Sequence, residues 1–445
     1  MATPESLLTA LYPFVPLLSS QRRFNPDVSK KVRRYLNALA LISVARPAGD
    51  VIAVTLATRK EETALYIATN GGVSQSVVDH LRAVWRCLRQ ISRGPAGSSS
   101  DSKGFSQELR MEIVHRIYHF TWKKFQRRFN KRAPVFLESV RRLIGEMSDQ
   151  DPALLKNIES SFLKIGALTR LGTPEDSDID SLVEQLDAIQ STISNLYGTI
   201  QYDVRRYLKK VLALRNHIND LLSVGWDKKF QSMLSAPLRI VPIPAMSRQF
   251  MVNLDDPAFV LHCFGSQEEV HKARPRWIRD VLNKVRLELT KKKHISTLGD
   301  DTYSCAEVYT HCECALVVYL QDHSEVNPIR FIGVSKLCCQ VCFTFIRVYK
   351  LKGRIRYQYA GTHGKIYLPY VFPELPDGNT PNLDAEVRNE ILKILTEDFQ
   401  EGWTQKHKGR QVSDSTAASF MTSDDEESKR AVDESESTSS LRMTF

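Results

Sequence analysis

Six of the eight cysteines of this chain lie between residues 305 and 342, and His311 and Glu313 lie among them. His311 and Glu313 have the spacing H-x-E, and Cys339 and Cys342 have the spacing C-x-x-C. One imidazole and two thiolates form a ligand set that zinc accepts in catalytic sites, where a fourth position stays open for water. The pattern therefore predicts a Zn²⁺ site whose ligands are His311, Cys339 and Cys342.

Glu313 is the candidate proton carrier of this site. H-x-E followed by C-x-x-C is the signature of zinc deaminases that act on nucleobases, and their glutamate is a general acid and base rather than a ligand. In such a site a zinc-activated water attacks the ring carbon that bears the amino group, while the glutamate moves the protons. The expected reaction is hydrolytic deamination, which hydrolyses a C–N bond of a cyclic amidine.

Three further cysteines, Cys312, Cys314 and Cys338, leave other ligand choices open. We favour Cys339 over Cys338 because only Cys339 gives C-x-x-C with Cys342. Cys312 and Cys314 are expected to be small core residues. A closed site with an extra cysteine ligand would be structural, and the alternative function is therefore a catalytically inactive, zinc-stabilised module that binds protein or nucleic acid.

Two helices and one strand must position these residues. The apolar pattern predicts helices that open at residues 311 and 337, with a short buried strand at 329–336 between them. Positions i and i+2 lie about 200° apart inside a helix. His311 and Glu313 can therefore share one target only if the helix begins near His311, with Thr310 as the expected cap.

The segments His311-Cys-Glu, Ile332-Gly-Val-Ser-Lys-Leu-Cys-Cys-Gln-Val-Cys and Thr362-His-Gly-Lys-Ile-Tyr resemble a poorly characterised, mainly fungal deaminase-like family. This family belongs to the zinc-dependent cytidine deaminase-like superfamily and is related to bacterial toxin-type deaminases. The resemblance spans about residues 270 to 385 and implies an α-β-α sandwich whose two zinc-bearing helices pack side by side. It also implies that His311, Cys339 and Cys342 are ligands and that Glu313 is the proton shuttle.

The chain departs from the superfamily pattern at two points. Cys338 stands where many members have proline before the first zinc cysteine. The two strands that the superfamily has ahead of the first helix have no clear counterparts in the sequence.

Three residues are candidates for substrate contacts. Ser335 and Lys336 lie at the end of the predicted strand, and His363 lies on a later turn. Lys336 also fits a solvated surface charge and His363 a plain turn residue, since turns favour such polar positions.

The length of 445 residues and a composition of 42% hydrophobic and 25% charged residues are typical of a globular protein of two or three domains. The fold class expected is an α/β C-terminal domain after a mostly helical N-terminal region. The predicted parts are a small α/β or helical unit (1–92), a linker (93–104), a helical region (105–235), an extended connector (236–269), the zinc domain (270–385), a helix (386–405) and a disordered acidic Ser-rich tail (406–445).

The net charge of the chain and the absence of certain sequence motifs limit the classes of ligand that it could bind. The net charge of +10 is compatible with a polyanionic partner and equally with a solvated surface. Residues 115–132 interleave aromatic and basic side chains, as nucleic-acid-binding helices do, although an amphipathic helix with its aromatics in the core is favoured. No phosphate-binding glycine loop, dinucleotide fingerprint or G-x-S-x-G elbow occurs. The expected partner is a nucleobase-containing substrate, free or in nucleic acid.

The start of the chain has no basic segment and its apolar stretch is broken by Pro13 and Pro16, which does not fit a secretory signal. No segment is apolar for long enough to span a bilayer. We therefore expect an intracellular protein, cytoplasmic or nuclear, with no membrane contact. Clustered cysteines in a reducing compartment more often bind metal than form disulfides. The sequence does not indicate the oligomeric state.

Overall fold

A computed structural model describes residues 28–407, except for residues 47–49, 60, 95–99, 147–151, 196–201, 255–281, 284, 288, 292–294, 300, 324, 353–355, 365–366, 368–369 and 376–381. Most of the predicted tail, residues 408–445, lies outside the described residues, as does the centre of the predicted linker 93–104. The last helix, α15, spans Leu383–His407.

The main sheet has five strands in the order β3-β2-β1-β7-β8. The strands are β1 (Ile52–Thr58), β2 (Thr63–Thr69), β3 (Leu238–Pro242), β7 (Phe331–Val334) and β8 (Gln358–Tyr359). β1 pairs antiparallel with both β2 and β7, whereas β3 runs parallel to β2 and β8 runs parallel to β7. The sheet is continuous across three of the predicted ranges, and the division into domains stays a prediction.

The two faces of the β1–β2 hairpin carry side chains of different size, because successive residues of a strand point to opposite faces. Ile52, Val54 and Leu56 contribute to one hydrophobic core, and Ala53 and Ala57 contribute to a second. The small alanine side chains leave room for helix α13, which packs on β1 and β2 on the second side. The hairpin therefore supports α13, the helix that begins after His311 and contains Glu313.

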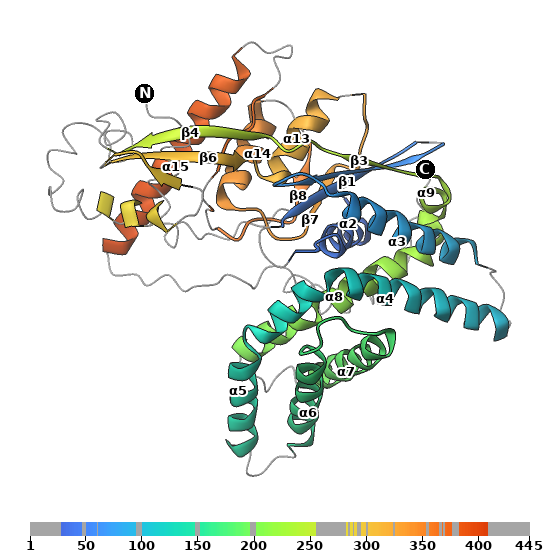
Figure 1. The fold of residues 1–445 in the computed structure, drawn as a ribbon. Coiled ribbons are helices and arrows are strands. Elements are labelled where there is room, and N and C mark those ends of the chain that lie inside the picture. Colours follow the sequence, from blue (N-terminus) through green and yellow to red (C-terminus); the bar gives the residue numbers. More distant parts are fainter. Residues whose placement is uncertain are drawn as a thin grey trace, which may run out of the picture.

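Helices cover both faces of the main sheet, which confirms the expected α-β-α sandwich (Figure 1). The side chains of α2 (Lys30–Ile42) and α3 (Gln75–Arg93) join the first core, and those of α13 (Cys312–Asp322) and α14 (Gln340–Lys352) join the second. α2 approaches β7 at Gly333, where a Cβ atom would lie 2.3 Å from the backbone of Leu36. A helix can pack this closely on the strand only because the residue there has no side chain.

A helical arm extends from the α2 side of the sheet (Figure 1). It contains α4 (Ser100–Asn130), α5 (Ala133–Glu146), α6 (Ala153–Leu168), α7 (Asp176–Asn195) and α8 (Tyr202–Gly225), whereas α9 (Gln231–Ser235) lies beside α3. Four aromatic side chains of α4 are buried in the arm's core: Tyr118, Trp122, Phe125 and Phe129. The Phe125 ring stacks on those of Trp122 and Phe129 at centroid distances of 5.8 and 6.3 Å. These rings form the arm's core, as the amphipathic interpretation of residues 115–132 predicts.

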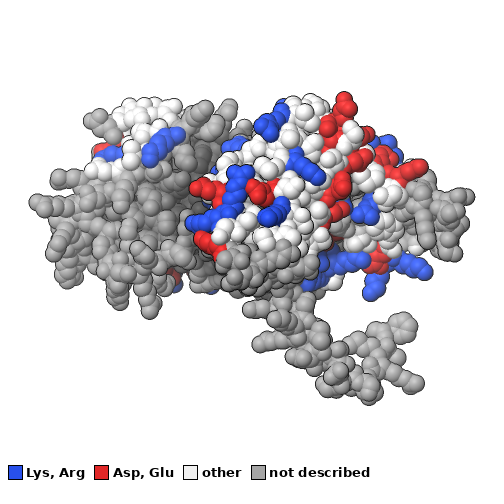
Figure 2. Space-filling view, turned by 90° about the horizontal axis from the view of Figure 1, so that it is seen from below, with Lys and Arg blue, Asp and Glu red and all other residues white. Residues whose placement is uncertain are grey.

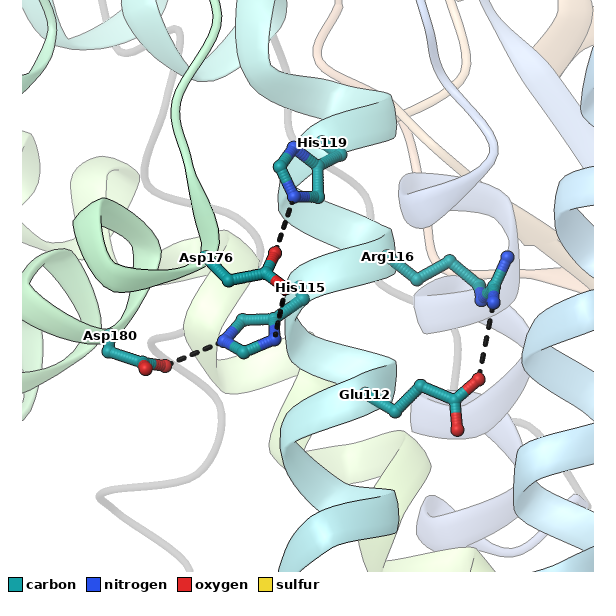
Figure 3. Close-up of polar contacts among 6 residues, drawn as sticks. All are labelled: Glu112, His115, Arg116, His119, Asp176 and Asp180. Atoms are coloured by element: carbon teal, nitrogen blue, oxygen red, sulfur yellow. Dashed lines mark hydrogen bonds and ion pairs between the residues drawn. The ribbon is translucent and has the colours of Figure 1, made fainter.

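Polar contacts also join α4 to α7 (Figure 3). His115 Nε2 lies 2.6 Å from Asp180 Oδ1, and His119 Nε2 lies 2.7 Å from Asp176 Oδ1. Both histidines lie on one face of α4 because residues four apart in a helix are neighbours. The two helices are thus joined at the edge of the arm by matched pairs.

A second, antiparallel sheet has the order β4-β6-β5 and consists of β4 (Ser247–Asn253), β5 (Ile295–Thr297) and β6 (Thr302–Tyr309). β6 ends directly before Thr310, whose backbone N–H donates to Met246 O at 2.8 Å. This sheet therefore holds the chain in place where it enters the site. Within the described part of the chain, no helix is long and apolar enough to cross a membrane.

Candidate metal centre

Three side chains from distant points of the sequence meet at the beginnings of α13 and α14. His311 Nδ1 lies 3.4 Å from Cys339 Sγ and 3.3 Å from Cys342 Sγ, and the two sulfur atoms are 3.4 Å apart. Both cysteines are buried, whereas His311 is partly exposed. Among the described residues, these three form the one group of histidine, cysteine or carboxylate side chains compact enough to hold a metal ion.

Helix α13 begins where the H-x-E spacing requires. His311 is the N-cap residue, with an extended backbone (φ −65°, ψ 142°), and the helix starts at Cys312. Asn70 at the end of the β1–β2 hairpin satisfies the helix start, because its Oδ1 accepts from Cys312 N at 3.0 Å. The prediction that Thr310 caps this helix is wrong, because Thr310 lies one residue before the N-cap position. Its buried hydroxyl makes no hydrogen bond to any described residue.

The second helix start separates Cys339 from Cys338. Cys339 directly precedes α14, and its Sγ accepts from Cys342 N at 3.3 Å. The backbone of Cys338 instead pairs with the chain around Thr362, whose hydroxyl donates to Cys338 O at 2.9 Å. The Cys338 side chain is buried outside the three-residue cluster, and so the structure brings together the C-x-x-C pair.

Glu313 lies beside the cluster without being part of it. Its side chain is only 3% exposed, and its Oε2 lies 3.9 Å from Cys342 Sγ and 3.4 Å from Cys312 Sγ. Burial raises the pKa of this carboxyl group, and the nearby His311 opposes the rise. A carboxyl group in this position can exchange protons with a molecule held at the cluster.

The electrostatics of the cluster favour a mixture of charges. Burial raises the pKa of Cys339, but the hydrogen bond from Cys342 and the adjacent His311 outweigh it and hold that pKa well below its ordinary value. Burial raises the pKa of Cys342 well above its ordinary value. The pKa of His311 is raised by Cys339 in spite of burial. A divalent cation bound among the three side chains would favour the thiolate form of both cysteines and the neutral form of His311.

The donor set fits zinc. Zinc prefers nitrogen and sulfur donors, and tetrahedral ligands at its usual bond lengths lie about 3.5 to 3.8 Å apart. The observed separations of 3.3 and 3.4 Å are within a few tenths of an ångström of that value.

Tyr370 and Cys314 form a second layer behind the cluster. The Tyr370 ring meets the His311 ring edge-on, with centroids 4.8 Å apart and planes at 82°, and Tyr370 Oη lies 3.3 Å from Cys314 Sγ. Tyr370 is fully buried and therefore fixes the tilt of the imidazole. The sequence predicted neither Tyr370 nor Asn70, because no local spacing links them to His311.

The three candidate substrate residues lie in different surroundings. Ser335 is buried and extends the pairing of β7 with β1, since its Oγ accepts from Ile52 N at 2.9 Å. Lys336 is exposed. The His363 ring packs edge-on against Tyr367 with centroids 5.1 Å apart. Substrate contact by these residues stays a prediction, and the structure gives Ser335 a role in the sheet.

Comparison with known proteins gives one match. Residues 310–374 match the OTT_1508-like deaminase family. This part of the chain is a deaminase-like domain of the cytidine deaminase-like kind. The matched residues include the starts of α13 and α14 and Tyr370, whereas the β1–β2 hairpin and Asn70 lie outside them. The match identifies the family but does not show that the protein is of fungal origin. No curated protein and no solved structure matches the chain.

Proposed function

We propose that the deaminase-like domain is a zinc-dependent hydrolytic deaminase that acts on a nucleobase, either in a free nucleoside or nucleotide or in nucleic acid. One observation carries the proposal: three donors suited to zinc converge, and a buried carboxyl group that is not among them lies 3.9 Å from one of the sulfur atoms. A purely structural zinc site has no use for such a group, whereas deamination needs a proton carrier.

Each residue then has a distinct task. His311, Cys339 and Cys342 hold the metal, which when bound supplies a Lewis acid next to the substrate. Glu313 takes a proton from the attacking water and delivers protons to the ring nitrogen and to the amino group, which leaves as ammonia. The water oxygen remains on the ring as a carbonyl, and so the reaction balances without a further co-reactant.

Burial and the neighbouring residues favour proton transfer by Glu313. Its side chain is almost completely buried, and electrostatic interactions are stronger where water is excluded. Asn70 fixes the start of α13 and Tyr370 fixes the His311 ring, so the two catalytic side chains are held relative to each other. Such preorganisation removes much of the cost of aligning the reacting groups.

Ammonia release from cytosine- and adenine-containing nucleosides and single-stranded oligonucleotides tests the proposal. Glu313→Gln should lower turnover by at least about 100-fold, the usual contribution of a general acid–base group, and should keep one zinc ion per chain. Glu325→Gln is the matched control, because Glu325 is exposed just beyond the same helix. Retained activity in Glu313→Gln would contradict the assigned role. No ammonia from any substrate, with zinc bound, would favour the non-catalytic module instead.

A further inference from the structure

Six basic side chains lie on two helices of the arm, just after one of them and in the deaminase-like domain. We call this group the basic seam and define it as Lys124 and Arg128 of α4, Arg132 just after α4, Arg206 and Lys210 of α8, and Lys336 of the deaminase-like domain. α4 and α8 contact each other beneath the main sheet (Figure 1). Arg128 Nη1 donates to Lys210 O at 3.4 Å, which places the basic residues of both helices at one contact.

The charges of the seam crowd one another. Burial and the nearby Arg206, Arg132 and Arg128 lower the pKa of Lys210 to about 8. Burial, followed by Arg128 and Lys336, lowers the pKa of Lys124 well below its ordinary value. Like charges held together in a folded protein cost free energy, which a bound anion would offset.

In the described part of the chain, two basic side chains at the centre of the seam contact backbone oxygen atoms. Lys124 Nζ donates to the backbone oxygen Leu41 O at 3.3 Å, and the Arg128 contact given above is also to a backbone oxygen. Asp50 raises the pKa of Lys124 and Lys336, but its Oδ1 is 2.9 Å from Arg46 Nη2. By contrast, basic and acidic side chains are interspersed on the face of the molecule in Figure 2.

Lys336 is the residue of the seam that lies nearest to the donor cluster in the sequence. This exposed residue lies three positions before Cys339, and Cys312 and Glu313 are close enough to affect its pKa. Partial desolvation of its charged end, followed by Arg128, lowers the pKa of the same lysine. Lys336 is therefore within electrostatic range of both α4 and the proposed catalytic carboxyl group.

Three aromatic rings that alternate with Lys124 and Arg128 along α4 are not available to a ligand. Trp122, Phe125 and Phe129 are at most 3% exposed and stack inside the arm. Proteins that stack bases along a strand need exposed rings. The seam therefore suits phosphate groups, which it can contact without regard to the identity of the base.

We propose that the basic seam binds the phosphate backbone of a single-stranded nucleic acid while one of its bases enters the metal centre. This inference rests on the proposed function. From Lys124 to the end of α4 at Asn130 the chain advances about 9 Å along the helix axis. Arg132 lies beyond that end, so the seam exceeds the reach of one phosphate group. Because Glu313 is 3% exposed, a base must leave its stack to reach it, and a single strand gives up least in doing so.

Fluorescence anisotropy of the zinc-loaded full chain with labelled, mixed-sequence single-stranded RNA and DNA tests the proposal. The seam variant combines Arg132→Gln, Lys210→Gln and Lys336→Gln. Its matched control combines Lys123→Gln, Arg127→Gln and Lys164→Gln, which remove the same charge from exposed positions of α4 and α6 outside the seam. A double variant, Arg132→Gln with Lys336→Gln, changes exposed residues alone and should give an intermediate effect if loss of Lys210 disturbs folding.

Salt dependence gives the expected size of the effect. Each phosphate contact on a single strand contributes about 0.7 to the slope of log affinity against log salt. With six contacts, affinity should fall about 300-fold between 50 and 200 mM salt. With three contacts removed the fall should be about 20-fold, whereas the control variant should behave like the natural chain. Binding of either RNA or DNA with this pattern supports the proposal.

Several results would overturn the inference. One is an equal loss of oligonucleotide affinity in the seam variant and the control variant. A second is a mononucleotide that competes for binding as strongly as the oligonucleotide does. A third is a higher affinity for duplex than for single-stranded nucleic acid. Seam-dependent binding without any ammonia release would refute the proposed function and leave the seam as a binding surface. Deamination of free nucleosides without oligonucleotide binding would refute the basic seam as a binding surface and would support the proposed function.

Discussion

Gly333 tests how the sheet positions the metal centre. In Gly333→Ala the new Cβ would lie 2.3 Å from Leu36 C and 2.4 Å from Leu36 O. Carbon atoms in contact normally stay about 3.5 to 4.0 Å apart, so α2 and β7 must separate by more than about 1 Å. Because the obstacle is backbone rather than a flexible side chain, we expect the upper part of the usual overpacking cost, about 3 kcal/mol.

The same displacement should reach the zinc ligands. α2 also holds β7 through Asn37, whose Oδ1 accepts from Val334 N at 3.1 Å, and β7 leads to Cys339 within five residues. Gly333→Ala should therefore lower both the free energy of unfolding in urea and the zinc retained after dialysis against a weak chelator.

Gly145→Ala is the control for the Gly333 experiment. Gly145 lies in the last turn of α5, and a Cβ there would meet nothing within 4 Å. This change should be neutral or should stabilise the chain by up to about 1 kcal/mol. If Gly333→Ala were as stable as the natural chain and kept its zinc, the close packing of α2 on β7 would be refuted.

Two further changes test the helix start and the pH response. Asn70→Ala should cost about 1 kcal/mol in urea unfolding by removing the acceptor for Cys312 N, while Asn70→Asp should cost less; equal losses would contradict the capping role. Burial, aided by Arg116, lowers the pKa of His80 to about 3. Its contribution to stability is therefore complete above pH about 6.5 and is lost as the pH falls from there toward 3. In the natural chain the free energy of unfolding should decline with falling pH by up to about 1.4 kcal/mol per pH unit in that window, and His80→Phe should remove this decline. The same dependence of the unfolding free energy on pH between pH 7 and 5 in both proteins would contradict the prediction.

The sequence predicted the three residues of the donor cluster better than the residues that support them. His311 with Glu313 and Cys339 with Cys342 are each close in the sequence, and the helix starts that orient them follow from local spacing. Asn70 is 242 residues from its partner Cys312. No local pattern could indicate that contact, because it depends on how distant strands pair.

The main sheet shows the same division between local and distant information. The buried strand predicted at residues 329–336 overlaps β7, and β1 is its neighbour in the sheet. Their antiparallel pairing was not predicted, and β1 and β2 lie far ahead of α13 in the sequence. In the same way, periodicity predicted that aromatic side chains of α4 lie in the core, but it could not indicate that Lys336 affects the pKa of Lys124.

Metal analysis of cysteine and histidine variants tests the central claim most directly. The natural chain should carry one zinc ion, and His311→Ala, Cys339→Ser and Cys342→Ser should each lose it under conditions in which the protein stays folded. Cys314→Ser and Cys338→Ser should keep it, because both residues lie outside the cluster of donors. Zinc that survived the loss of Cys339, or disappeared with Cys314, would contradict the account.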